Sequence, residues 1–228
     1  MSLIELKPTS IGEVNIPFDK PYFLKGYCKG MSAVDKWSDN DYLKKNFKNI
    51  LIYNVEHYKS KKDFETTKVC ETLTKNFDDY VKEMYHKNIY LSDVNLLKYK
   101  ESIEDSILKD LINPNDYKLG LKDNLESMNL YMGVDTKTGM HCHIEDDFLL
   151  NQIVGTKRIY IRNDLDKITD LEEYNHSEEN FFDLDWEKMD VYYVDLKPGD
   201  SFCFPPTCWH AVQSDGYTLG VTKVWKRK

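Results

Sequence analysis

TGMHCHIE, residues 138–145, and PGDSFCFPPTCWH, residues 198–210, contain three of the six histidines of this 228-residue chain. Both segments have the short apolar runs and the Gly or Pro punctuation of β-strands. In a strand, residues i, i+2 and i+4 lie on one face, so His141, His143 and Glu145 are expected to point the same way. The pattern therefore predicts a metal site on a β-sheet.

His210 is the best candidate for a ligand from a second strand. An iron(II) site that leaves positions open for small molecules takes three protein ligands on one face of its octahedron. A zinc site that uses Cys142, Cys208 and the histidines is the rival. Cys142, however, alternates to the face opposite His141, and neither cysteine belongs to a CxxC pair. We therefore expect metal ligation by His141, His210 and one of His143 or Glu145, and not by the three remaining histidines.

The composition, with 41% hydrophobic and 31% charged residues, is that of a globular chain. No apolar run approaches the length of about 18 residues that a membrane span needs, and the N-terminus lacks a signal pattern. The five cysteines are odd in number and lack the spacing of a disulfide framework. We expect an intracellular protein, cytoplasmic or nuclear, that has no membrane contact and whose thiols pack as small hydrophobes.

The net charge of −8 is unevenly distributed. Residues 164–190 contain eleven Asp or Glu and two Lys, whereas no wide basic face is visible. Bulk charge therefore disfavours nucleic acid as a partner, although it does not exclude RNA. The acidic segment is long for a strand connection, so we expect a solvated excursion near the barrel mouth that favours a basic peptide.

Two patterns divide the chain, which we interpret as one domain of residues 1–228. Residues 1–123 contain helical periodicity, above all at residues 67–85, where apolar side chains recur at steps of three and four. Residues 124–228 contain short apolar runs that predict a β core, with hairpin turns at residues 155–156 and 215–216. The predicted fold class is mainly β with α, a double-stranded β-helix or jelly-roll with a helical N-terminal third.

The chain resembles the JmjC and cupin-like (Cupin_8) family of Fe(II)- and 2-oxoglutarate-dependent oxygenases, in which a double-stranded β-helix carries a His-x-Asp/Glu…His triad. The similarity covers most of the chain and rests on three blocks. The first block contains KPYFLKG (20–26), KWS (36–38) and YL (42–43). The second runs from LYMG (130–133) to GTKR (155–158). The third contains LKPGD (196–200), Pro205, WH (209–210) and VW (224–225).

The resemblance implies a cosubstrate site as well as a metal site. By position, Thr138 and Lys157 match residues that hold 2-oxoglutarate, and an ammonium group with a neighbouring hydroxyl is a suitable clamp for its distal carboxylate. Tyr131, in the matching strand, and Lys223, which stands where many relatives have Asn, are further candidates for cosubstrate binding. Without the histidines, Lys157 would be interpreted as an ordinary hairpin lysine.

Two alignments of the triad remain open. One places His143 where the family has its carboxylate, which gives His141-x-His143…His210. The other gives His143-x-Glu145…His210, an orthodox triad, but replaces the family's threonine by a methionine. We favour the first alignment because it keeps Thr138.

The resulting hypothesis is an oxygenase that hydroxylates a side chain of a protein or peptide. A cupin dioxygenase with three histidines, acting on a small molecule without 2-oxoglutarate, is an alternative, because a neutral ligand set is also found in such enzymes. A non-catalytic binding module and a methyl-lysine demethylase are the others. The oligomeric state is left open.

Overall fold

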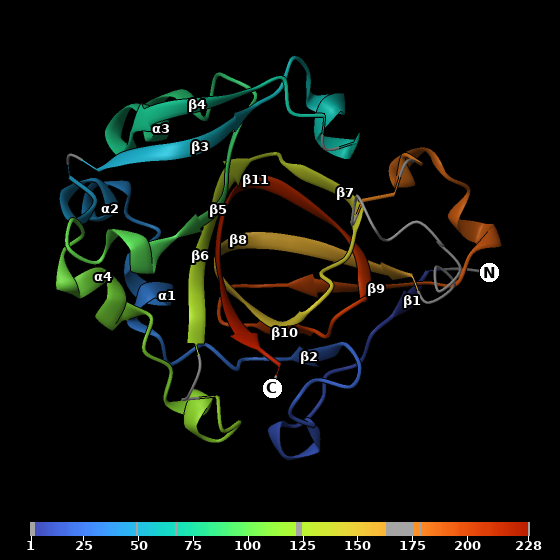
Figure 1. The fold of residues 1–228 in the computed structure, drawn as a ribbon. Helices are drawn as coiled ribbons and strands as arrows, with labels where there is room; N and C mark the ends of the chain where they lie inside the picture. The colour runs from blue at the N-terminus through green and yellow to red at the C-terminus, as the bar shows by residue number, and fades with distance from the viewer. Residues whose placement is uncertain are drawn as a thin grey trace.

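The computed structural model describes residues 3–48, 50–66, 68–121, 125–162, 176–177 and 179–227. Its centre is an 11-stranded mixed sheet that curls into a barrel, consistent with the expected jelly-roll (Figure 1). The strands are β1 (Ile4–Glu5), β2 (Tyr22–Leu24), β3 (Leu51–His57), β4 (Glu71–Asn76), β5 (Ile89–Asn95), β6 (Leu125–Val134), β7 (Lys137–His141), β8 (Asp146–Arg162), β9 (Val191–Leu196), β10 (Ser201–Phe204) and β11 (Trp209–Lys226).

The prediction of a helical N-terminal third is wrong. In the part of residues 1–123 that the structure describes, five strands join the sheet, and the four α-helices have only five to seven residues each. They are α1 (Ser32–Lys36), α2 (Asn40–Asn46), α3 (Phe77–Glu83) and α4 (Asp105–Asp110). Short 3₁₀ turns complete the chain: η1 (Ile11–Glu13), η2 (Lys61–Thr66), η3 (Leu96–Tyr99), η4 (Pro114–Tyr117), η5 (Phe181–Asp183) and η6 (Trp186–Lys188).

The helix expected over residues 67–85 shows why the periodicity misled. Apolar residues four positions apart share a face in a strand as well as in a helix. Leu73 pairs with Val55 in the β3–β4 ladder, and only the second half of the segment is helical. The side chain of Asn76 accepts a hydrogen bond from the backbone nitrogen of Asp78 at 3.0 Å, which starts α3 at Phe77.

β8 and β11 are the two long strands that form the barrel. They pair antiparallel from Trp209↔Arg162 to Lys226↔Asp146, with register shifts near the middle. The hairpin turns expected at residues 155–156 and 215–216 are therefore wrong. Gly155 and Gly216 both have φ of 69° and instead mark the bend at which each strand passes from one side of the barrel to the other.

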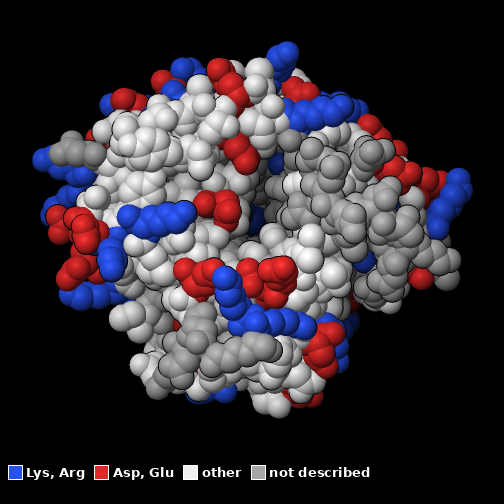
Figure 2. Space-filling view, in the orientation of Figure 1, with Lys and Arg blue, Asp and Glu red and all other residues white. Residues whose placement is uncertain are grey.

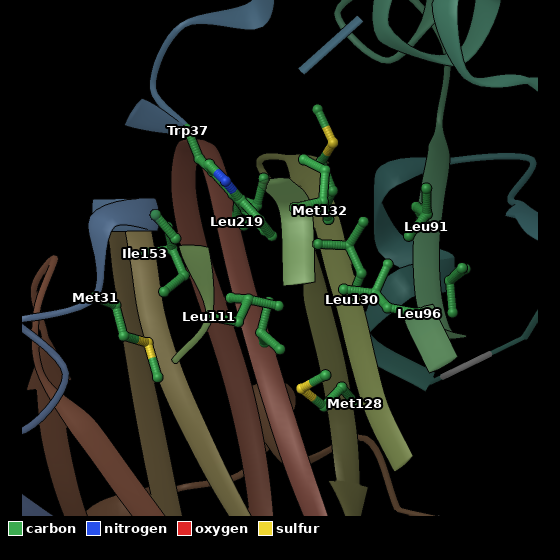
Figure 3. Close-up of a cluster of buried hydrophobic side chains, with 14 of the residues drawn as sticks. Met31, Trp37, Leu91, Leu96, Leu111, Met128, Leu130, Met132, Ile153 and Leu219 are labelled. Atoms are coloured by element: carbon green, nitrogen blue, oxygen red, sulfur yellow. The ribbon is translucent and has the colours of Figure 1, made fainter. Parts of the chain in front are cut away.

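The outer face of the sheet packs against the N-terminal segments. A large cluster of buried side chains joins α1, α2 and α4 to β5, β6, β8 and β11 (Figure 3). Asp110 of α4 adds a polar link, because it accepts hydrogen bonds from Lys36 at 2.6 Å and from the indole of Trp37 at 3.1 Å. We call this side of the sheet the outer face.

The inner face of the barrel carries a second apolar cluster. Its buried members are Phe23, Leu150, Ile159, Ile161, Val194, Leu196, Phe202, Phe204 and Cys208. Side chains directly opposite each other in an antiparallel ladder point to the same side of the sheet. Gln152 is two residues from Leu150 and therefore lies on the inner face, with Gly220 beside it and Tyr131 on the far side of Gly220. Lys157 is two residues from Ile159 and lies beside Ser214 on the same face.

Three smaller expectations can be compared with the described ranges. Among the described helices, none has the length and apolar composition of a transmembrane segment. All five cysteines are free, and four of them are buried, as expected for small apolar side chains. Of the acidic segment, residues 163–175 and 178 lie outside the described ranges. Its described part forms η5 and η6, and Asp183 there pairs with Lys62 at 3.0 Å.

Candidate metal centre and its surroundings

Three histidines meet at one end of the inner face. His141 is the last residue of β7, and it pairs directly with His210, the second residue of β11. His143 follows in the turn after β7. One potential ligand atom from each of the three lies within 4.8 Å of the other two. Residues from two distant parts of the sequence are thus brought to a spacing that one metal ion could bridge.

The backbone fixes the orientation of two of these rings. Nδ1 of His141 lies 2.9 Å from the carbonyl oxygen of Gly139, and Nδ1 of His210 lies 2.8 Å from that of Cys208. Because a carbonyl only accepts, each Nδ1 must carry the proton and donate it. The lone pair is then on Nε2, the tautomer that binds a metal. The ring of His143 is held differently, by stacking on Phe148 at 3.8 Å between centroids.

The surroundings keep the three imidazoles neutral. Burial lowers the pKa of His141 to about 4. Burial, together with the neighbouring His141 and His176, lowers the pKa of His143 to about 3. The pKa of His210 is also well below its usual value, first because of burial and then because of the other histidines. Neutral imidazole is the form that ligates metals, so no proton has to be displaced near pH 7.

Glu145 is not part of this group. β7 ends at His141, and the chain turns before β8 begins at Asp146. The alternation of side chains between the two faces of a strand therefore does not extend to Glu145, which was expected on the same face as His141. Glu145 is exposed and lies outside the three-histidine group. The backbone oxygen of His143 instead accepts a hydrogen bond from the nitrogen of Thr207 at 2.6 Å, which ties the turn to the loop before β11.

The cysteines beside the histidines also stay apart from the group. Cys142 is buried in a cluster with Met140 and Trp209, whereas Cys208 packs in the inner apolar cluster. No potential ligand group in the described ranges combines a cysteine with the histidines. The zinc alternative therefore has no support from the geometry.

A bulge in β7 brings Thr138 onto the same face as His141. Residues three apart in a regular strand point to opposite sides. Here, however, Thr138 pairs with Val212 while His141 pairs with His210, and the register shifts between these pairs. Since Val212 and His210 are two apart, Thr138 and His141 share the inner face. By the same register, Thr138 lies between the histidines and Lys157.

Lys157 is a buried cation on the inner face. It is 4% exposed, and burial lowers the pKa of its ammonium group to about 8. Its Nζ lies 5.7 Å from the centre of the Tyr131 ring. No hydrogen bond or ion pair to this ammonium group occurs within the described ranges. A buried cation without a counter-charge is costly, which is the property expected of a site that binds an anion.

Lys223 lies on the other side of the sheet. It pairs with Met128 in the β6–β11 ladder, and Met128 belongs to the outer core. Its ammonium group forms an ion pair with Asp116 at 2.5 Å and donates to the carbonyl oxygen of Leu111 at 3.0 Å. The structure therefore places the Lys223 ammonium group on the outer face, away from Lys157 and the histidines.

Two residues near the site were missed by sequence reasoning. Asp93 of β5 accepts hydrogen bonds from side chains of β6 on the inner face, but it belongs to a region interpreted as helical, so no pattern placed it there. His176 forms an isolated backbone bridge with His141, and the two rings stack at 5.5 Å. It lies in the acidic segment, and only the fold brings it to the histidines.

Comparisons with known proteins agree with this fold. An X-ray structure of E. coli ycfD has a TM-score of 0.60 at 13% identity, covering 92% of this chain and 50% of that one. A crystal structure of Escherichia coli ribosomal oxygenase YcfD has a TM-score of 0.56 at 15% identity, covering 99% of this chain and 54% of that one. At such identities the similarity shows the fold alone, and this chain spans about half the length of those chains.

No curated protein matches the sequence. The family described as a cupin-like domain matches residues 11–228, nearly the whole chain. Its match includes both histidine segments and all of β6 to β11. This protein therefore belongs to the cupin-like domain family.

Proposed function

We propose that this protein is an oxygenase that uses Fe(II) and 2-oxoglutarate to hydroxylate a side chain of a protein or peptide. The observation that carries the proposal is the convergence of three neutral imidazoles on a face that also holds an uncompensated buried lysine. When bound, the metal and cosubstrate supply an oxidant from molecular oxygen, with succinate and carbon dioxide as co-products.

The residues present fit these groups. His141, His143 and His210 would hold the metal as neutral ligands, and the carbonyl groups of Gly139 and Cys208 would keep two of the rings aligned. Lys157 would bind the distal carboxylate of the cosubstrate, with the Thr138 hydroxyl beside it. The hydroxyl of Thr218, which is fully buried and without a hydrogen-bond partner in the described ranges, is a further donor on the same face.

A protein or peptide substrate is supported by the shape and charge of the open face. Figure 2 shows a hollow near the centre of the molecule, with Asp and Glu side chains near its rim and Lys or Arg side chains within and beside it. Together with the net charge of −8, this favours a basic peptide over nucleic acid. The structural neighbour described as a ribosomal oxygenase also favours a macromolecular substrate. We further propose that residues 1–228 act as one domain, since strands from both halves share one sheet.

The three-histidine set favours one second candidate, a dioxygenase that acts on a small molecule without 2-oxoglutarate. Such a metal site lacks the negative charge that a carboxylate ligand brings. Lys157 favours the first candidate, because a site without an anionic cosubstrate gives no reason to bury an unpaired ammonium group.

Anaerobic reconstitution with Fe(II), followed by iron analysis and a succinate assay, tests the proposal. We expect about one iron per chain and succinate release that depends on 2-oxoglutarate. His141→Ala, His143→Ala and His210→Ala should each lose iron, whereas Glu145→Gln should retain it. Lys157→Met should retain iron but weaken 2-oxoglutarate binding, and Lys109→Met, at a lysine whose side chain is 70% exposed, is the matched control.

Three results would count against the proposal. Iron that persists in the His143→Ala protein but is lost from Glu145→Gln would show that the wrong third ligand had been assigned. Oxygen consumption that is indifferent to 2-oxoglutarate would favour the second candidate. Formaldehyde released from a methylated peptide would indicate demethylation in place of stable hydroxylation.

A further inference from the structure

Asp93 is held at the edge of the inner face by two residues of the neighbouring strand. Its Oδ1 accepts a hydrogen bond from Nδ2 of Asn129 at 2.6 Å and from the hydroxyl of Tyr131 at 2.9 Å. Asp93 has a φ of 55°, in the left-handed region that Asp tolerates better than most residues. This backbone lies in the bulge between Leu91 and Val94 of the β5–β6 ladder, where a positive φ is common.

The same strand presents a buried acceptor that has no donor. Because a carboxylate can only accept, the amide nitrogen of Asn129 must face Asp93, and its Oδ1 must point elsewhere. That oxygen is buried and has no hydrogen-bond partner in the described ranges, and Asn129 as a whole is only 7% exposed. Buried acceptors are nearly always satisfied, so this one calls for a donor from outside the described chain.

Gln152 repeats the pattern on the same face. Its Nε2 donates to the backbone oxygens of Val154 at 2.7 Å and Gly155 at 3.0 Å, which fixes the amide orientation. Its Oε1 is left without a partner among the described residues, and the side chain is fully buried. Gln152 lies beside Gly220, which in turn pairs with Tyr131, so both orphan oxygens face the interior near Tyr131.

The charge around these oxygens is negative and the walls are aromatic. Oδ2 of Asp93 has neither an ion pair nor a hydrogen bond in the described part of the chain. Glu56 is a second carboxylate nearby: burial first, and then the charge of Asp93, raise its pKa. Tyr58, Tyr90 and Tyr131 form one aromatic cluster here. Acceptor oxygens, a carboxylate and aromatic rings together suit a cation that carries N–H donors.

We propose that Asp93, with the side-chain oxygen of Asn129, recognises a positively charged side chain of the substrate peptide, an ammonium or a guanidinium group. This rests on the proposed function and names the substrate class of that site. The Tyr131 ring separates two regions of opposite charge. Lys157 lies over its face, and Asp93 binds its hydroxyl. An anionic cosubstrate and a cationic side chain are thus directed to different walls of one interior.

Binding, measured without turnover, tests this role. The full chain, loaded with Fe(II) and 2-oxoglutarate under nitrogen, is titrated against fluorescein-labelled seven-residue peptide pools with uncharged random flanks. The central residue is Arg or citrulline in one pair of pools, and Lys or acetyl-lysine in the other. We expect one charged pool to bind at least about fivefold more tightly than its neutral counterpart, and which one does so distinguishes guanidinium from ammonium.

Asp93→Asn should reduce that ratio to about one while leaving iron content and 2-oxoglutarate affinity unchanged. Asn is tolerated at positive φ, and Asp93→Gly is a second variant that keeps the backbone and removes the carboxylate. Asp105→Asn makes the same charge change on the exposed surface of α4 and controls for bulk attraction; its ratio should match that of the unaltered protein.

The outcomes separate the two proposals. Equal binding of charged and neutral pools, or a preference that survives in both Asp93 variants, would overturn the assignment of Asp93. A preference that requires Asp93 in a protein that never releases succinate would leave the assignment standing and reject the oxygenase. Succinate release without any charge preference would do the opposite.

Discussion

If Lys157 binds 2-oxoglutarate as proposed, its protonation controls that binding. Burial lowers the pKa of its ammonium group from the usual value of about 10.4 to about 8. The charged form is therefore complete below pH 7 and is lost as the pH rises through 8, whereas 2-oxoglutarate remains a dianion throughout. The dissociation constant of 2-oxoglutarate should be about tenfold larger at pH 9 than at pH 7.

Isothermal titration of the Mn(II)-loaded protein with 2-oxoglutarate from pH 6.5 to 9.5 measures this dependence. Lys157→Met should bind weakly at every pH and show no break near 8. Were the unaltered protein to bind equally well at pH 7 and pH 9, Lys157 could not be the group that holds the carboxylate.

At the scale of single residues, the sequence allowed the histidines to be predicted but not all of their companions. His141, His143 and His210 stand out through spacing and local punctuation, which are local properties. Glu145 and Lys223 lie apart from the histidines, because their positions depend on where β7 ends and on which face of β11 turns inward. Asp93 depends on a pairing between β5 and β6 that no local pattern encodes.

At the scale of elements, β7 depends on its close approach to η2. A Cβ atom added at Gly139 would lie 2.5 Å from the backbone oxygen of Glu65, so the two segments would have to separate. The ion pair of Lys137 with Glu65 at 2.7 Å holds them together. Gly139→Ala should lower the free energy of unfolding by about 1–3 kcal/mol.

The same substitution should weaken iron binding, because the carbonyl group of Gly139 orients His141. Urea unfolding and iron titration of the variant measure both effects. Gly30→Ala is the control, since a Cβ there meets nothing within 4 Å, and it should change neither property. Stability and iron affinity equal to those of the unaltered protein would show that η2 can move away without cost.

The elements themselves were predictable to different degrees. The short apolar runs that predicted a β core in residues 124–228 lie in strands. A short run that is apolar on both faces is typical of a strand buried within a sheet. The N-terminal elements were harder. β4 and α3 share one apolar spacing, and a side-chain cap at Asn76, together with pairing to β3, decides where one ends and the other begins.

At the scale of the whole molecule, the ion pair of Asp147 with Arg227 connects both ends of the described chain to the barrel. Asp147, at the start of β8, lies 2.9 Å from Nη2 of Arg227 and accepts a hydrogen bond from the backbone nitrogen of Phe18 at 3.3 Å. Arg227 also donates to the backbone oxygen of Phe18. The Asp147 side chain is only 7% exposed, so without Arg227 it would be a buried charge with no counter-ion.

Arg227→Gln should therefore lower the free energy of unfolding by about 1–3 kcal/mol at pH 7, less than for a fully buried pair because Arg227 is partly exposed. Burial already raises the pKa of Asp147, and Arg227 opposes this rise. Without Arg227 the pKa of Asp147 in the folded state rises further above its unfolded value. The loss of unfolding free energy is therefore greatest at high pH and becomes smaller as the pH falls through the raised pKa.

Urea unfolding at pH 7 and pH 4.5 measures this dependence, and the loss of unfolding free energy should be smaller at pH 4.5. Asp147→Asn in the same chain should recover part of the loss at pH 7. A loss of equal size at both pH values would show that Arg227 stabilises the protein through packing and not through its charge.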